Sequence, residues 1–196
     1  MLYETMNSLC LAGGYAAIAL AAVGSSLGAG VAGMAAIGAW KKCYAQNKPA
    51  PFLLLAYAGA PLSQTIYGLI MMIFIKNQIN AGVPDTAGNF TAEAIANAQY
   101  TLECWPLFLL MGIIGGIAMG VSAIYQGKAA AAGCVAFGET GKGFANNLMI
   151  LGIVETVAIF ALVFCLLAMP TGTRPMVKAA RVGGQPAQTL EVKIQK

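Results

Sequence analysis

The chain has 196 residues and a formal net charge of +4. Hydrophobic residues make up 59% of it and charged residues only 9%, and its mean hydropathy is +0.73. Soluble domains carry roughly 25% charged residues, so the composition excludes an ordinary soluble domain and predicts a membrane protein. No histidine is present and the five cysteines include no CxxC pair, which argues against a zinc site or a disulfide framework.

The first apolar segment, at about 12–39, is longer than the roughly 20 residues that span a bilayer. The residues before it lack Lys and Arg, so we expect a retained helix rather than a secretory signal. Gly28, Gly30 and Gly33 form a literal GxGxxG, but no strand precedes it and we expect no nucleotide site. Small residues also recur at every fourth position, which predicts a face that another helix approaches closely: Gly24, Gly28, Ala32 and Ala36.

Residues 40–50 form a short loop that contains Lys41, Lys42 and Lys48. Short basic loops stay on the cytoplasmic side, so we expect this loop to face the cytoplasm and both termini to lie outside. A second apolar helix is expected at about 52–75. Because proline has no N–H to donate, we expect this helix to kink at Pro61.

Polar residues follow the proline at mid-depth of this second helix. Ser63, Gln64 and Tyr67 are spaced so that three oxygen-bearing side chains lie on or near one helix face. Polar atoms inside a membrane need partners. The spacing leaves two alternatives open, because these side chains either bond to a neighbouring helix or form part of a binding site.

The second half of the chain predicts two further helices. An acidic connection at about 76–103 is expected outside the membrane, and a third helix follows at about 107–132. Gln126 and Lys128 lie near the far end of that helix, with Lys128 expected near the cytoplasmic boundary. A loop at about 133–143 then leads to a fourth helix at about 147–169.

Glu155 is the only charged residue in the fourth apolar segment. An ionised carboxylate at the centre of a membrane helix costs roughly 2.5–3.5 kcal/mol or more, so such a residue indicates a functional site. The chain must supply it with partners, a proton or an ion.

The two halves of the chain resemble each other. Residues 35–38 are similar to residues 130–133, and Gln64 occupies the place in the second helix that Glu155 occupies in the fourth. We interpret the chain as a duplicated helical hairpin in which one copy has an acid and the other an amide. The predicted organisation is a first hairpin at 11–79, an external connection at 80–104, a second hairpin at 105–169 and a flexible basic tail at 170–196.

Three motifs in this order resemble one known family. Residues 61–68 (PLSQTIYG), Gln126-Gly127-Lys128 and Val154-Glu155-Thr156 are similar to the proteolipid (c or K) subunit of V-type and A-type rotary ATPases, in particular to prokaryotic Na⁺-carrying members. The resemblance covers about residues 11–169. It implies an all-α membrane protein with four transmembrane helices in two tandem duplicated hairpins, which assembles into a homo-oligomeric ring that turns and carries Na⁺ or H⁺ across the membrane.

The resemblance also implies which residues hold the ion. Glu155 matches the ion-binding carboxylate, and Gln126 and Gln64 match its amide ligands. Ser63 stands where threonine is usual, and Tyr67 matches a tyrosine that bonds the carboxylate. Ala60 stands where a backbone carbonyl completes the set of ligands. Leu62 and Thr65 depart from the family pattern, which often has glycine at both positions.

The two possible ions, H⁺ and Na⁺, differ in the number of oxygen ligands that they require. A proton needs only a carboxyl group in a dry site, because desolvation favours its protonated form. A hard cation such as Na⁺ needs several oxygen ligands. Glu155, Gln126, Gln64, Ser63 and one backbone carbonyl would supply about five, so we expect Na⁺ as the bound ion, with H⁺ as the alternative in which the amides only hold Glu155 protonated.

The resemblance further implies partners and a location. The implied partners are identical subunits in a ring, a stator membrane subunit, the central stalk and the lipid bilayer, with no nucleic acid. The implied location is a prokaryotic inner membrane. ATP chemistry would take place on other subunits, since the chain has no nucleotide site of its own. The loop around Lys41 and Lys42 is the expected contact with the central stalk. Two other classes stay open: a small multispan secondary transporter or channel, and a structural membrane scaffold.

Overall fold

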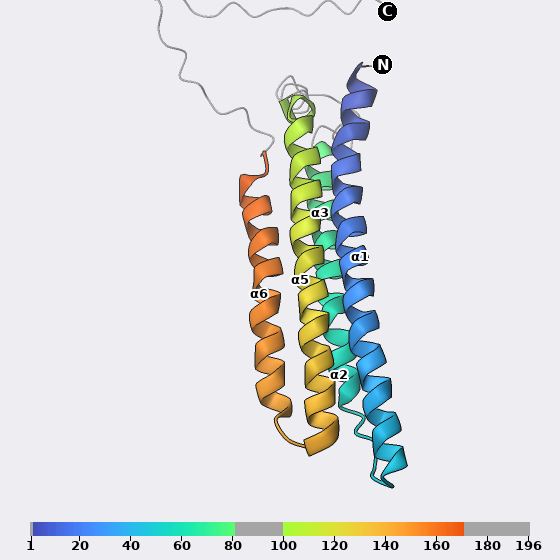
Figure 1. Cartoon of the computed structure of the whole chain (residues 1–196). Coiled ribbons are helices and arrows are strands. Elements are labelled where there is room, and N and C mark those ends of the chain that lie inside the picture. The colour runs from blue at the N-terminus through green and yellow to red at the C-terminus, as the bar shows by residue number, and fades with distance from the viewer. Residues whose placement is uncertain (1, 81–99, 171–196) are drawn as a thin grey trace, which may run out of the picture.

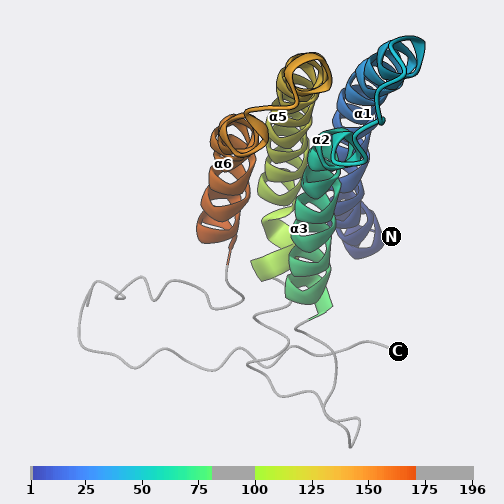
Figure 2. The same cartoon turned by 90° about the horizontal axis from the view of Figure 1, so that it is seen from below.

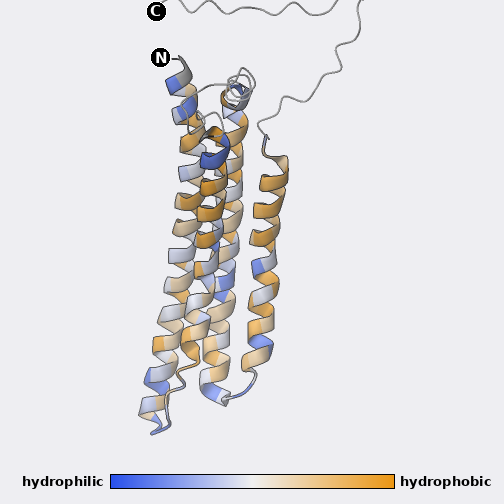
Figure 3. Cartoon of the chain, turned by 180° about the vertical axis from the view of Figure 1, so that it is seen from behind, coloured by the Kyte–Doolittle hydropathy of each residue, from blue (hydrophilic) through white to orange (hydrophobic). Residues whose placement is uncertain are grey.

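The computed structural model describes residues 2–80 and 100–170. Four of its helices are long and apolar enough to cross a membrane, and no strand occurs among the described residues. The protein is an all-helical, multi-pass membrane protein, as the composition predicts. Figure 3 shows mainly hydrophobic residues along the helices and hydrophilic residues toward both ends of the bundle.

The first hairpin consists of α1 (Leu2–Ala45), α2 (Leu54–Gly59), the 3₁₀ turn η1 (Ala60–Leu62) and α3 (Ser63–Asn80). The first helix is therefore longer at both ends than the expected 12–39. The break between α2 and α3 lies where a kink was predicted, because Pro61 cannot donate to the carbonyl one turn earlier. Local 3₁₀ bonding replaces the missing bond, and the backbone N–H of Ser63 donates to the carbonyl of Ala60.

The second hairpin consists of α5 (Trp105–Thr140) and α6 (Phe144–Ala168). The expected loop at 133–143 is wrong, because α5 continues to Thr140 and only a short turn joins it to α6. Gly141 ends α5 in the left-handed conformation (φ 63°) and Gly143 precedes α6 with φ 83°. Lys128 consequently lies within α5, where its ammonium is 4.8 Å from the ring centre of Tyr125.

The helices form a bundle in which α5 contacts α1, α3 and α6 (Figures 1 and 2). The closest approach is between α1 and α5. A Cβ atom added to Gly24 would meet the backbone of Gly120, and one added to Gly112 would meet the backbone of Gly13. The small residues of α1 therefore form the contact face that their four-residue spacing predicts. Gly30 and Gly33 of the GxGxxG motif have open space beside them in this chain.

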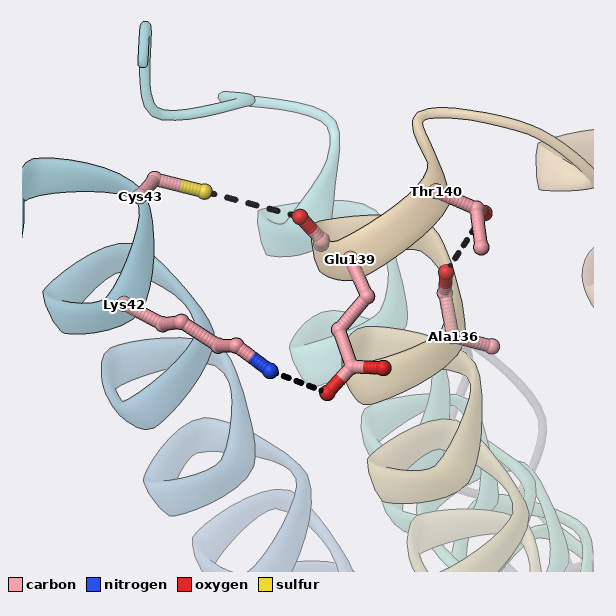
Figure 4. Close-up of polar contacts among 6 residues, drawn as sticks. Lys42, Cys43, Ala136, Glu139 and Thr140 are labelled. Atoms are coloured by element: carbon pink, nitrogen blue, oxygen red, sulfur yellow. Dashed lines mark hydrogen bonds and ion pairs between the residues drawn. The ribbon is translucent and has the colours of Figure 1, made fainter. Parts of the chain in front are cut away.

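The connections of both hairpins lie at the same end of the bundle (Figure 1). At that end, the ammonium of Lys42 lies 2.6 Å from Oε1 of Glu139, and the thiol of Cys43 donates to the carbonyl of Gly138 across 3.6 Å (Figure 4). These contacts join the last turns of α1 and α5. The expected tail at 170–196 and most of the expected external connection lie outside the described residues.

Candidate ion-binding site

Glu155 lies on α6 and receives hydrogen bonds from two other helices. The hydroxyl of Tyr67 on α3 donates to Oε1 of Glu155 across 2.6 Å. The amide nitrogen of Gln126 on α5 is 3.4 Å from Oε2. Each carboxyl oxygen thus has a donor, and hydrogen bonds to an ionised acceptor are the stronger kind. The arrangement offsets part of the cost of a carboxylate inside the bundle.

Gln126 connects α5 to α3 and α6. Its side chain is completely buried. Its Nε2 also donates to the backbone carbonyl of Leu151 on α6 across 3.0 Å, while its Oε1 accepts a 2.8 Å hydrogen bond from Nε2 of Gln64. Because a buried amide needs partners for both its oxygen and its nitrogen, these bonds fix which way the Gln126 side chain points.

Three oxygens gather at the break between α2 and α3. The hydroxyl of Ser63 lies 3.1 Å from the carbonyl oxygen of Ala60 and 3.2 Å from Oε1 of Gln64. The 3₁₀ turn at Pro61 is what brings the carbonyl of Ala60 beside the side chains of the next turn. Gln64 is completely buried, so its amide links this oxygen group to Gln126 and, through it, to Glu155.

The structure thus brings all six residues named from the sequence into one connected network: Ala60, Ser63, Gln64, Tyr67, Gln126 and Glu155. Both amides would have to turn to offer their oxygens to a cation, because Nε2 of Gln126 points toward Glu155 and Nε2 of Gln64 points toward Oε1 of Gln126. The donor set is nevertheless carboxylate, amide, hydroxyl and carbonyl oxygen, which suits a hard cation. The described residues contain no cluster of His, Cys, Asp or Glu that could hold another kind of metal ion.

Leu62 and Thr65, the two departures from the family pattern, do not close this site. Leu62 is 52% exposed on the surface of the chain. Thr65 is half-buried, and the bond between Tyr67 and Glu155 still forms across α3 and α6. The side chain of Leu62 therefore lies on the surface of the single chain, and that of Thr65 leaves the bond between Tyr67 and Glu155 in place.

Sequence reasoning missed Ser122. This residue lies on α5 one turn before Gln126, is 4% exposed, and donates a 2.9 Å hydrogen bond to the carbonyl of Val154, which directly precedes Glu155. The bond ties the backbone of α6 to α5 beside the carboxylate. Its spacing of four residues from Gln126 was the available signal, because positions i and i+4 share a helix face.

A comparison with protein families found a match in the second hairpin. Residues 109–168 match the family model of the ATP synthase C-subunit. The match covers most of α5 and all of α6, including Gln126 and Glu155, and it supports a proteolipid subunit of a rotary ATPase. A search of curated proteins found no match to the chain. The first hairpin lies outside the matched range, so its contribution to the site comes from the contacts of Gln64 and Tyr67 described above.

Proposed function

We propose that this protein is the ring-forming subunit of a V- or A-type rotary ATPase and that it carries an ion across the membrane on Glu155. The observation that supports this best is the placement of Glu155. It lies on an otherwise apolar helix that matches the ATP synthase C-subunit family, and it accepts hydrogen bonds from Tyr67 and Gln126 on two other helices. An intramembrane carboxylate with such partners is typical of an ion pathway.

The ion we propose is Na⁺, with H⁺ as the alternative. A proton would need the carboxyl group alone. The chain supplies additional oxygens in the same network, because the hydroxyl of Ser63 lies 3.1 Å from the carbonyl oxygen of Ala60 and 3.2 Å from Oε1 of Gln64. A modest turn of the two glutamine amides would direct their oxygens toward a cation beside Glu155.

The net charge of the Glu155 site determines when the site can cross the membrane in the proposed transport cycle. With Na⁺ or H⁺ bound, the Glu155 site is neutral, and a neutral site crosses hydrocarbon at a much lower cost than a free carboxylate. At the stator, a fixed cation of that partner would compete for the carboxylate and release the ion into water. Rotation of the ring would couple this step to ATP hydrolysis or synthesis on soluble subunits.

The proposed partners are further copies of this chain, the stator membrane subunit and the central stalk, in a prokaryotic inner membrane. The connections of the two hairpins are the proposed side for the stalk. All three lysines of this region are exposed, but Lys42 is paired with Glu139, whereas Lys41 and Lys48 have no ion pair among the described residues. The latter two are therefore the better candidates for an acidic surface on the stalk than Lys42, although the sequence singled out Lys41 and Lys42 together.

A small secondary transporter or channel is the competing class. Such a protein needs a water-accessible path between its helices. The contact between α1 and α5 argues against a path there, since a single added Cβ at Gly24 or Gly112 would meet backbone atoms. A structural scaffold explains this close packing but gives no reason for the network around Glu155.

Carbodiimide labelling, followed by mass spectrometry, tests the proposal. Carbodiimides modify a protonated carboxyl group in an apolar setting. We expect selective modification of Glu155 in the membrane-embedded protein, with protection by Na⁺, while the exposed Glu139 serves as an internal control for general reactivity. Labelling that does not depend on Na⁺ and falls with rising pH would indicate a ring that carries protons. An unreactive Glu155 would contradict an ion-carrying role.

A further inference from the structure

Ser25 on α1 has a buried hydroxyl that the site described above does not use. The residue is 2% exposed, and its Oγ is the one buried side-chain polar atom of residues 2–80 and 100–170 that has no hydrogen-bond partner. Its neighbour Ser26 is exposed and donates to the carbonyl of Val23 within its own helix. Because buried polar groups nearly always have a partner, the unused oxygen of Ser25 needs an explanation.

The packing of α1 against α3 shows what Ser25 faces. The two helices run in opposite directions (Figure 1). A Cβ added to Gly68 would lie 2.9 Å from the Cβ of Ala21, and one added to Gly28 would lie 3.0 Å from the Cβ of Pro61. Ser25 lies between Ala21 and Gly28 on the same face of α1, since residues three and four apart are neighbours on a helix.

Counting along both helices places Ser25 level with Gln64. Ser25 follows Ala21 by four residues, and Gln64 precedes Gly68 by four. Both helices rise by about 1.5 Å per residue, so equal steps in opposite directions along the chain keep the two residues at the same depth. Both side chains are buried there, which puts the free hydroxyl beside the Gln64 end of the network.

The amide of Gln64 has an N–H donor that could pair with the Ser25 hydroxyl. Its amide group carries two N–H donors, and among the described residues only Oε1 of Gln126 accepts one of them. A cation bound between Glu155 and the two glutamines needs both amide oxygens. The Gln64 amide must then turn its oxygen toward the cation and its N–H groups away from Oε1 of Gln126, and in a dry interior those N–H groups need other acceptors.

We propose that Ser25 is a positioning residue of the ion site: its hydroxyl accepts an N–H of Gln64 when the cation is bound and so holds Oε1 of Gln64 toward the cation. The inference rests on the proposed function, because it concerns the cation-loaded site. Ser25 acts through Gln64 and does not itself touch the ion. It would make α1 the fourth helix that contributes to ion binding, after α3, α5 and α6.

The test compares Ser25→Ala with the matched control Ser26→Ala in membranes that contain the complete complex. The readout is the Na⁺ concentration that half-protects Glu155 from carbodiimide labelling. We expect this concentration to rise about fivefold in Ser25→Ala, which corresponds to one lost hydrogen bond. Ser26→Ala should match the wild type, and Ser25→Thr, which keeps the hydroxyl, should restore most of the affinity.

A merely structural role predicts a different pattern. Ser25→Ala would then lower ring stability or labelling without Na⁺, and the half-protecting Na⁺ concentration would not change, which would overturn the inference. An equal shift in Ser25→Ala and Ser26→Ala would overturn it as well. If Na⁺ fails to protect Glu155 in the wild type, the proposed sodium function fails, and the role of Ser25 fails with it. Protection in the wild type with no effect of Ser25→Ala contradicts only the Ser25 inference.

Discussion

Tyr67 donates a 2.6 Å hydrogen bond to Glu155, although 88 positions separate the two residues in the chain. The bond joins the first hairpin to the second at the only charged residue of α6. A hydrogen bond to an ionised acceptor is of the stronger kind. The first hairpin, which lies outside the range matched by the ATP synthase C-subunit family, therefore contributes directly to the chemistry of the second.

Removing this bond is expected to weaken ion binding at Glu155 without abolishing it. In Tyr67→Phe, Glu155 keeps Gln126 as a donor but loses the Tyr67 hydroxyl. Hydrogen bonds to charged groups are worth roughly 1.5–3 kcal/mol, so the loss should weaken ion binding at Glu155 by that order. The Na⁺ concentration that half-protects Glu155 from carbodiimide labelling should therefore rise roughly 10- to 100-fold above that of the wild type. Identical half-protecting Na⁺ concentrations for the two proteins would show that the bond has no such role.

Glu155→Gln removes the charge and keeps the shape of the side chain. We expect ATP-driven ion uptake by reconstituted vesicles to fall to background, because an amide can neither lose a proton nor neutralise Na⁺. The ring should still assemble, since the close contact between α1 and α5 does not involve this residue. Glu139→Gln is the matched control, because Glu139 is an exposed carboxylate paired with Lys42. A Glu155→Gln complex that still pumps would refute the proposed role of this residue.

Gln126→Ala should lower the affinity for Na⁺. The substitution removes a donor to Glu155 and leaves Nε2 of Gln64 without its acceptor. Losing bonds of this kind costs about 1.5–3 kcal/mol, which is roughly a 10- to 100-fold rise in the Na⁺ concentration required for transport. Ser122→Ala provides the comparison, because Ser122 bonds only the backbone carbonyl of Val154 and should shift the requirement far less. An unchanged sodium requirement in Gln126→Ala would remove Gln126 from the ion-binding shell.

The close contact between α1 and α5 gives a prediction about stability. In Gly24→Ala, the new methyl group would meet the backbone of Gly120, which cannot move aside as a side chain can. We expect a loss of about 1–3 kcal/mol in stability and a lower melting temperature of the detergent-solubilised protein, because overpacking forces the backbone to shift.

Gly30→Ala is the matched control on the same helix, because an added Cβ there has nothing within 4 Å in the single chain. It should be neutral or slightly stabilising, since alanine has the higher helix propensity. Equal melting temperatures for the two variants would contradict the close approach of α1 and α5. A loss confined to Gly30→Ala in the assembled ring would instead place Gly30 against a neighbouring copy.

Hydrophobic patterning determined much of this fold directly. The composition and the length of the apolar segments indicated four helices in a membrane, because a bilayer requires about 20 apolar residues and internally satisfied backbone groups. The hydrophobic pattern did not predict the helix ends accurately. α5 continues through an alanine- and glycine-containing stretch to Thr140, since small residues are compatible with a helix that packs closely against α1.

The sequence by itself determined which residues were chemically unusual. A carboxylate, an amide and a hydroxyl in apolar helices are costly, so Glu155, Gln64 and Ser63 could be identified from position alone. Gln126 was assigned through the resemblance to the proteolipid family.

Only the tertiary structure decided how these groups pair. Hydrogen bonds require distances near 3 Å, and no sequence spacing fixes the rotation of one helix against another. The fold therefore settled that Tyr67 bonds Glu155, that Gln64 bonds Gln126, that Ser122 holds the backbone of α6, and that the hydroxyl of Ser25 is buried without a partner on the face of α1 that meets α3.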